Sequence, residues 1–485
     1  MVAHRRRGVA ALALFWCVAA AAAPVGGEAT LLLALMVRDE AANLRANLPR
    51  LRSVADAVVC GIDDRSADDS AYAIVEALPG VPRWVYYFTF DGFGAGRSRV
   101  FAEAWARFPG VSHVLVLDPD WEAVRLVKAQ LDLDHRTFLF KVVDRNGLTT
   151  RTMNWLCRHE AGLSFAHALH EQLVQPARTE PSNAKLLTWE FTEREVKGRA
   201  TWHRTTEHGH SQSHARYLFD LSLLARDLED LGEDDAHTLF YLGVTHLSAL
   251  DALLGIGEHN RTAQTDRHVA EGVRYLERRL SPRVLEKHER SHPGKHEHTW
   301  AAMRWLGHAH HFSTRNLGEA RAWYRRCSAY DDDRHDCATF LAKLCRDEGR
   351  SGEAFATAFP ALVRATTRPA PAMRMVDNFY VQACTLPLEV GLSLLPAVEE
   401  AASRDGAWAA LAAFGSAALA AADAACDDPT RRFITEPPAS VAAARSRYAA
   451  LGAASGCVAR RDALAAADGD ADAVRAMVAT GLRLC

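Results

Sequence analysis

Acidic residues follow two apolar stretches in the first quarter of this 485-residue chain. Asp63 follows residues 57–62, and Asp118 follows residues 113–117, with Asp120 two positions later. A carboxylate beside a buried strand must be paired or bound to a cation, because an isolated buried charge is costly. An Asp-x-Asp turn offers two oxygen ligands to Mg²⁺ or Mn²⁺ and leaves positions free for phosphate oxygens and water. The pattern predicts a metal site at Asp118 and Asp120 that neutralises a departing diphosphate.

Alternating strands and helices are expected to position these acids. Continuous apolar runs predict buried strands, and the segments between them have helical periodicity. Such alternation is typical of βαβ units and a mostly parallel, Rossmann-like sheet. Because ligands of open parallel sheets lie beyond the carboxyl ends of the strands, the acids should meet there. We expect strands at 30–36, 57–62, 83–88, 113–117, 136–143 and 187–191, and helices at 39–51, 70–78 and 96–108.

After about residue 212 the strand signal ends and helical segments follow one another. Gly318-Glu319-Ala320 recurs 34 residues later, at 352–354, and Leu306-Gly307 has a counterpart at 341–342. A period near 34 with a small residue on each packing helix is typical of tetratricopeptide (TPR) repeats, which stack into an all-α solenoid. A plain helical bundle is the alternative. Residues 253–262 and 282–298 read as insertions or long loops.

The order of several short motifs resembles the family-2 glycosyltransferases that carry a C-terminal TPR region. The resemblance covers residues 30–175 and, less specifically, 212–370. It implies a GT-A fold and transfer of a sugar from a nucleotide-sugar donor to an acceptor, with inversion at the anomeric carbon. The motifs are Val37-Arg38-Asp39-Glu40, Asp63-Asp64-Arg65-Ser66, Phe93-Gly94-Ala95-Gly96-Arg97, Asp118-Pro119-Asp120, Gly162-Leu163-Ser164-Phe165 and Leu169-His170-Glu171-Gln172.

By position, the resemblance implies that Glu40 and Asp63 lie around the nucleoside, and that Arg97 stabilises the diphosphate. Asp118 and Asp120 would hold the diphosphate through Mn²⁺ or Mg²⁺. An inverting reaction needs one base to take the acceptor's proton. Glu171 is the first choice for that base, with His170 completing the metal shell or contacting phosphate; the alternative is that both residues anchor a loop.

The chain departs from the family pattern at several motif positions. Ala41 stands where the family usually has an acid, and Ser98 follows Arg97 where an Asn is usual. Trp121 follows Asp120 where an acid is common. These departures support an alternative hypothesis, in which the domain is catalytically degenerate and the TPR-like helices serve as a scaffold. The active enzyme would use the helices to recruit a protein or glycan acceptor, or a second copy of the chain in a homodimer.

Residues 1–27 read as a signal peptide, with a basic start at 4–7 and an apolar run at 9–23 that is short for a membrane span. We expect a secreted protein or one in the lumen of the secretory pathway; an uncleaved membrane anchor is the alternative. Some of the nine cysteines after the signal would then pair, although buried free thiols fit them equally well. The remaining boundaries follow composition: 28–211 for the glycosyltransferase domain, 212–370 for the repeats and 371–485 for an Ala-rich helical region.

Composition narrows the remaining classes. The formal charge of −3 argues against a nucleic-acid partner. No Walker loop is present and no Gly-x-Gly-x-x-Gly follows the first strand, which disfavours P-loop kinases and dinucleotide oxidoreductases. Three histidine clusters, at 203–214, 288–298 and 308–311, raise the alternative of zinc, although they lack the spacing of a fixed tetrad.

Overall fold

The computed structural model describes residues 29–143, 149–174, 184–193, 214–254, 262–291, 297–331, 336–350, 353–354, 357, 375–376 and 379–381. The predicted signal segment 1–27 and most of the Ala-rich region 371–485 lie outside these residues. Among the described helices, none is both long enough and apolar enough to cross a membrane.

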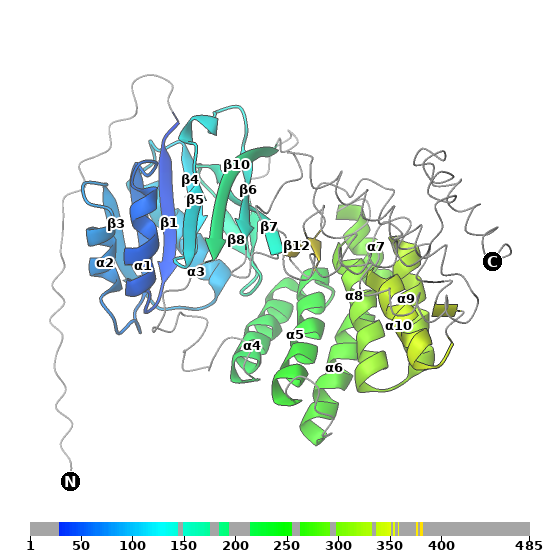
Figure 1. The fold of residues 1–485 in the computed structure, drawn as a ribbon. Helices are drawn as coiled ribbons and strands as arrows, with labels where there is room; N and C mark the ends of the chain where they lie inside the picture. Colours follow the sequence, from blue (N-terminus) through cyan, green and yellow to red (C-terminus); the bar gives the residue numbers. More distant parts are fainter. Residues whose placement is uncertain are drawn as a thin grey trace, which may run out of the picture.

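An α/β domain forms the first part of the chain, and helices form the second, as the sequence predicts (Figure 1). Its sheet has the strand order β3-β2-β1-β4-β7-β6-β10-β5, and the first four of these strands are mutually parallel. Strands β4 and β6 both run antiparallel to β7. The strands are β1 (Leu31–Val37), β2 (Ala57–Asp63), β3 (Arg83–Phe88), β4 (His113–Leu117), β5 (Trp121–Arg125), β6 (Thr137–Val143), β7 (Thr149–Arg158) and β10 (Ala184–Glu193), with β8 (Ser164–Ala166) and β9 (Gln172–Val174) forming a separate pair.

Helices cover both faces of the parallel part of the sheet. Leu33 of β1 belongs to the core under α1 (Ala41–Asn47) and α2 (Ser70–Ala77), whereas its neighbour Leu32 packs with α3 (Phe93–Arg107). Successive side chains of a strand point to opposite faces, so an uninterrupted apolar run requires cover on both. This packing explains why the strands at the centre of the sheet are readable from the sequence.

Strands β5 and β7 were not predicted from the sequence. Arg151 and Asn154 interrupt the apolar pattern of β7, so the segment shows no continuous hydrophobic run. β5 follows the acidic turn directly. β7 pairs with the preceding strand β6 and with the more distant β4, and β5 pairs with the distant β10.

Apart from α7, the helices of the second part pack in sequence order, with α6 against α8. α5 lies against α4 and α6, and α9 lies against α8 and α10. Small residues set two of these contacts: a Cβ on Gly243 would lie 2.5 Å from Leu276, and one on Gly307 would lie 2.4 Å from Tyr324. The helices are α4 (His214–Leu231), α5 (Ala236–Leu254), α6 (Ala263–Arg279), α7 (Pro282–Ser291), α8 (Glu297–His308), α9 (Leu317–Tyr330) and α10 (Asp336–Asp347).

Two expectations about this part are wrong. The loop expected at 282–298 contains α7 and the start of α8, because Pro282 at the first helical position favours a helix start and Val284 packs into the core. A short hairpin, β11 (Met375–Val376) and β12 (Phe379–Val381), lies in the region expected to be helical. β12 pairs with β7 and so returns the chain to the sheet of the α/β domain.

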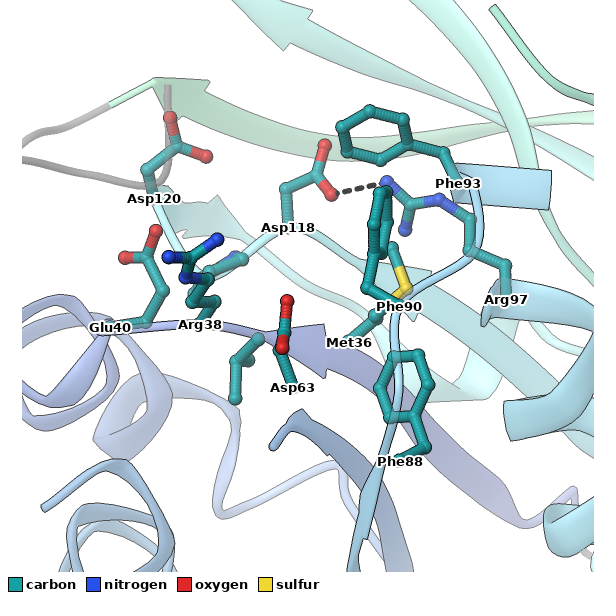
Figure 2. Close-up of a pocket in the computed structure, with 12 residues that line it drawn as sticks. Met36, Arg38, Glu40, Asp63, Phe88, Phe90, Phe93, Arg97, Asp118 and Asp120 are labelled. Carbon is teal, nitrogen blue, oxygen red and sulfur yellow. Dashed lines mark hydrogen bonds and ion pairs between the residues drawn. The ribbon is translucent and has the colours of Figure 1, made fainter. Parts of the chain in front are cut away.

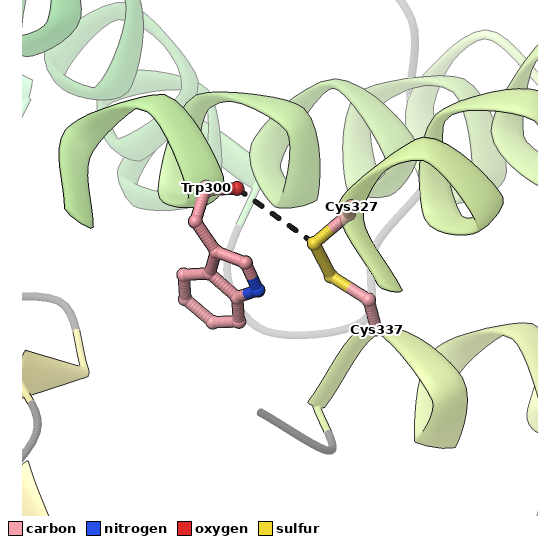
Figure 3. Close-up of a disulfide and its surroundings, with 3 residues drawn as sticks. All are labelled: Trp300, Cys327 and Cys337. Atoms are coloured by element: carbon pink, nitrogen blue, oxygen red, sulfur yellow. Dashed lines mark hydrogen bonds between the residues drawn. A yellow bond between two sulfur atoms is a disulfide. The ribbon is translucent and has the colours of Figure 1, made fainter. Parts of the chain in front are cut away.

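One disulfide joins two of these helices. Cys327 of α9 and Cys337 of α10 are bonded, and the Sγ atom of Cys327 lies 3.7 Å from the carbonyl oxygen of Trp300 in α8 (Figure 3). Cys345, also in α10, is a buried free thiol, as are Cys60 and Cys157 in the sheet. The sequence left pairing and free thiols open, and the described residues contain both.

Candidate functional site

A pocket lies at the carboxyl ends of the parallel strands β1, β2 and β4. It encloses about 470 Å³, including space open to solvent. Figure 2 shows Arg38, Glu40 and Asp120 on one side and the aromatic side chains with Arg97 on the other, with Asp118 between them. We call it the strand-end pocket; its lining residues are Met36, Val37, Arg38, Glu40, Asp63, Phe88, Phe90, Phe93, Arg97, Asp118, Pro119 and Asp120.

The acidic turn after β4 is held from both ends. The backbone N–H of Trp121 donates to the carbonyl of Asp118 at 3.1 Å, which closes a turn around Pro119 and Asp120. The side chain of Asn47, at the end of α1, donates to the carbonyl of Pro119 at 2.9 Å. Trp121 is fully buried and stacks on Trp155, so it anchors this turn in the core.

Arg97 links two of the predicted functional carboxylates. Its Nη2 donates to Oδ1 of Asp118 at 2.7 Å, and its Nε donates to Oε1 of Glu171 at 2.5 Å. The guanidinium is buried and lies 4.3 Å from the ring of Trp155. Burial opposes its charge, but Asp118 and Glu171 outweigh that effect and raise the pKa of Arg97 above its usual value. Arg97 therefore stays cationic and fixes Glu171 relative to the acidic turn.

Glycines before Arg97 allow α3 to approach its neighbours closely. A Cβ on Gly94 would lie 2.0 Å from the carbonyl oxygen of His167, and one on Gly96 would lie 2.4 Å from the sulfur of Met36. Gly94 accepts no side chain without movement of the backbone, and a side chain at Gly96 would require the side chain of Met36 to move. The glycines thus bring Arg97 within reach of both Asp118 and Glu171.

The two acids predicted to lie around the nucleoside are buried and partnered. Asp63 accepts hydrogen bonds from the backbone and side chain of Arg65, at distances of 2.7–3.0 Å. Burial opposes ionisation of Asp63, but the bonds from Arg65 prevail and lower its pKa. Glu40 accepts a bond from the side-chain amide of Asn43 at 2.7 Å, and its own N–H donates to Ser70. Both acids present negative charge to the strand-end pocket.

Five of the seven residues predicted for the site line this pocket: Glu40, Asp63, Arg97, Asp118 and Asp120. Glu171 joins them through its bond to Arg97. The structure does not bring His170 to the pocket, because its ring stacks on Tyr241 of α5 at 3.8 Å.

The loop that carries Glu171 is held by the helical region. Both carboxylate oxygens of Asp227, in α4, accept from the N–H of Ala168, at 2.9 and 2.7 Å. Nε2 of His237, in α5, donates to the carbonyl oxygen of His170 at 2.9 Å, which fixes the tautomer of His237 with its proton on Nε2. Nδ1 of His237 then accepts from the side-chain amide of Gln172 at 3.0 Å. The helices therefore position Glu171 although they contribute no residue to the strand-end pocket.

Sequence reasoning missed the residues that act from the second part of the chain and from unpredicted strands. Asp227 and His237 touch the site across separations of 59 and 67 residues. Trp155 lies on β7, whose strand pattern is interrupted. The aromatic residues Phe88, Phe90 and Phe93 were visible as a dense run after the third strand, and that density was the available signal.

A divalent cation is compatible with the acidic turn. Asp120 and Asp118 both line the pocket, and Mg²⁺ is commonly held by one or two carboxylates together with substrate phosphates. Among the described residues, no group of three or more His, Cys, Asp or Glu side chains is arranged to hold a metal ion. The two aspartates would therefore need oxygen atoms from a bound diphosphate and water to complete the shell.

No model of a known protein family matches this chain. No curated protein matches it either.

Proposed function

We propose that the α/β domain is a metal-dependent inverting glycosyltransferase of the GT-A type, related to family 2, and that the helices form a TPR-like solenoid. One observation carries the proposal: residues from three distant motifs, Arg97, Asp118 and Glu171, are bonded together at the carboxyl ends of parallel strands. The resemblance to the glycosyltransferases rests on the order of these motifs in the sequence. A nucleotide-sugar would occupy the strand-end pocket, and its acceptor would be a protein or a glycan.

Each residue has a role in that reaction. Glu40 and Asp63 would face the nucleoside, and Asp118 and Asp120 would hold Mn²⁺ or Mg²⁺, which supplies charge neutralisation for the departing diphosphate. Glu171 would take the proton of the acceptor hydroxyl as that oxygen attacks the anomeric carbon. Arg97 would exchange its bond to Asp118 for one to a diphosphate oxygen while it still orients Glu171.

A substitution at Asp120 tests the metal site. Asp120→Asn removes one carboxylate ligand, and we expect metal-dependent donor binding to weaken at least 100-fold. Purified full-length protein is titrated with a panel of nucleotide-sugars by calorimetry, with and without Mn²⁺, and nucleotide release is followed in parallel. Asp64→Asn is the matched control, because Asp64 is an exposed acid at the same sheet edge and bonds to Thr89. Unchanged donor affinity in Asp120→Asn would contradict the metal assignment.

A catalytically degenerate domain with a scaffold role is the second candidate. The observation that favours it is that Arg97 forms ion pairs with both Asp118 and Glu171 in this structure. The same titration decides between the two functions, since a degenerate domain would bind no donor with or without Mn²⁺ while remaining folded.

We also propose that the protein works in the secretory pathway lumen or outside the cell. The Cys327–Cys337 disulfide supports this location, because disulfides persist in oxidising compartments and are rare in reducing ones. The predicted signal peptide supports it independently.

A further inference from the structure

A second pocket lies at the seam between the α/β domain and the helices. It encloses about 910 Å³, including space open to solvent. We call it the seam pocket. The α/β domain contributes His167 and Gln172, which lie before and after Glu171 in the sequence. Helices α5, α7 and α8 and the turn before α5 contribute the other lining residues: Asp234, Asp235, Ala236, His237, Lys287, His288, Glu297 and His298.

A histidine nitrogen of this pocket is buried and has no hydrogen-bond partner in the part of the chain that the structure describes. The side chain of His167 is 7% exposed, and its Nδ1 has no hydrogen-bond partner among the described residues. Oδ1 of Asp235, 3.9 Å away, is too distant for a hydrogen bond. An unpaired buried polar atom is costly, so the arrangement favours a ligand atom that bonds to His167.

The ring of His167 belongs to a group of stacked aromatic side chains. Its imidazole stacks on that of His237, with ring centres 4.0 Å apart and planes 25° apart, and His298 stacks on Phe240 at 4.5 Å. Burial lowers the pKa of both His167 and His237, so these rings are uncharged near neutral pH. A neutral imidazole has one donor and one acceptor nitrogen, which matches the dual character of a hydroxyl group.

The backbone of the loop that carries Glu171 is strained at two residues. His167 and His170 have φ values of 68° and 53°, in the left-handed region that non-glycine residues rarely adopt. Such conformations cost about 1–3 kcal/mol each and persist only where surrounding contacts hold them. Here the bonds from Asp227 and His237 hold them. Strain maintained in this way is concentrated at ligand sites, and this loop contributes His167 and Gln172 to the seam pocket.

The loop also connects the two pockets chemically. Gln172 lines the seam pocket, and the preceding residue, Glu171, bonds to Arg97 in the strand-end pocket. A hydroxyl group presented from the seam pocket would therefore lie beside the loop that carries the proposed base.

We propose that the seam pocket binds the acceptor and that the acceptor is a carbohydrate. Sugar hydroxyls can bond to both His167 and Asp235, and the apolar face of a pyranose fits stacked imidazole rings. The lining carries both signs of charge, in Asp235 and Lys287, which suits an uncharged polyhydroxylated ligand. The assignment rests on the proposed glycosyltransferase function.

The transfer balances without any further reactant. The acceptor hydroxyl oxygen forms a bond to the anomeric carbon of the donor as the bond from that carbon to the diphosphate oxygen breaks. The electron pair of the broken bond leaves with the nucleoside diphosphate. Glu171 takes the hydroxyl proton.

Binding of oligosaccharides in the absence of donor tests the proposal. Full-length protein without nucleotide-sugar or metal is applied to an array of neutral oligosaccharides, and the best ligand is titrated by calorimetry. We expect His167→Gln and His298→Ala each to weaken that binding at least tenfold. The matched control is His135→Gln, a partly exposed histidine of the α/β domain that lies outside both pockets. Thermal unfolding verifies that each variant is folded.

The outcomes separate this inference from the proposed function. Donor binding with no oligosaccharide binding would overturn the acceptor assignment and leave the glycosyltransferase proposal standing. Oligosaccharide binding that survives in both variants would place the sugar elsewhere and overturn it too. Selective binding of an immobilised peptide library in place of the sugars would contradict the carbohydrate class. Oligosaccharide binding without any donor binding would refute the glycosyltransferase proposal but retain a sugar site at the seam.

Discussion

One loop, residues 167–172, contributes to both pockets, through the bond of Glu171 to Arg97 in the first and through His167 and Gln172 in the second, yet different parts of the chain build them. Residues 36–120, all in the α/β domain, line the strand-end pocket. The seam pocket takes residues from both regions. The first pocket is therefore readable from motifs placed at successive strand ends, whereas the second exists only once the helices have packed.

The two pockets also differ in how their polar groups are stabilised. In the strand-end pocket, carboxylates are paired with cations, as Asp63 is with Arg65 and Asp118 is with Arg97. At the seam, neutral imidazoles stack on one another, as His167 and His237 do. A carboxylate in an ion pair stays ionised in moderate acid, whereas a neutral histidine becomes protonated. The two regions should therefore respond differently to substitution and to pH.

The largest expected effect comes from breaking the ion pairs that connect the loop to the acidic turn. Arg97→Met leaves two carboxylates without their shared cation, and losing one partner of a buried pair costs about 3–5 kcal/mol. We expect the free energy of unfolding in urea to fall by that amount. Arg99→Met is the matched control on the same helix, because the Arg99–Asp91 pair is exposed and contributes about 1 kcal/mol or less. Equal losses in the two variants would show that Arg97 does not connect the pockets.

Acidification should destabilise the helices and the seam more than the sheet. Burial lowers the pKa of His246 to about 4 and that of His308 to about 3, so their contribution is complete above the unfolded pKa, near 6.5, and is lost as the pH falls towards these values. At about 1.4 kcal/mol per pKa unit, we expect the free energy of unfolding to drop by about 2–4 kcal/mol between pH 7.5 and 4.5. Asp220, whose pKa burial raises to about 6, acts in the opposite direction and reduces the drop.

Amide hydrogen exchange shows which part of the protein loses stability in acid. Amides of α5 and α8 should exchange faster at pH 5 than at pH 7.5 after correction for the intrinsic rate, and those of β1 and β2 should change less. The lowered pKa of Asp63 preserves its ion pair throughout this range, although buried His113 on β4 makes the contrast one of degree. Equal acceleration of amide exchange in the helices and in the sheet would contradict the expected difference in their sensitivity to acid.

A smaller effect is expected where α3 touches the loop. Gly94→Ala places a methyl group on the carbonyl of His167, and such overpacking costs about 1–3 kcal/mol. Chemical denaturation measures this loss, and oligosaccharide binding should weaken as the loop moves. In the control, Gly318→Ala, the nearest contact of the new methyl group is Asn316 at 3.6 Å, and we expect unchanged or slightly greater stability. If Gly94→Ala leaves the free energy of unfolding unchanged, the loop accommodates the methyl group without strain.

Sequence reasoning reached the parts of this fold that local pattern specifies. Strand β1 is apolar at every position because both of its faces are covered, and the acids stand where the strands end. The bond between Arg97 and Glu171 joins positions 74 residues apart, so it depends on packing that no local pattern encodes. The same holds for His237, whose interaction with the loop requires α5 to lie against it. His170 was expected to complete the metal shell or contact phosphate, with loop anchoring as the alternative, and its ring stacks on Tyr241 of the helices.

The pairing of β12 with β7 means that the α/β domain is not contiguous in the sequence. The chain leaves the sheet, builds the helices and returns to add a strand beside Thr149 and Thr150. A recombination event that joined residues 28–211 to a different partner would discard that strand along with the contacts of Asp227 and His237. The two regions are therefore expected to be inherited and exchanged as one unit.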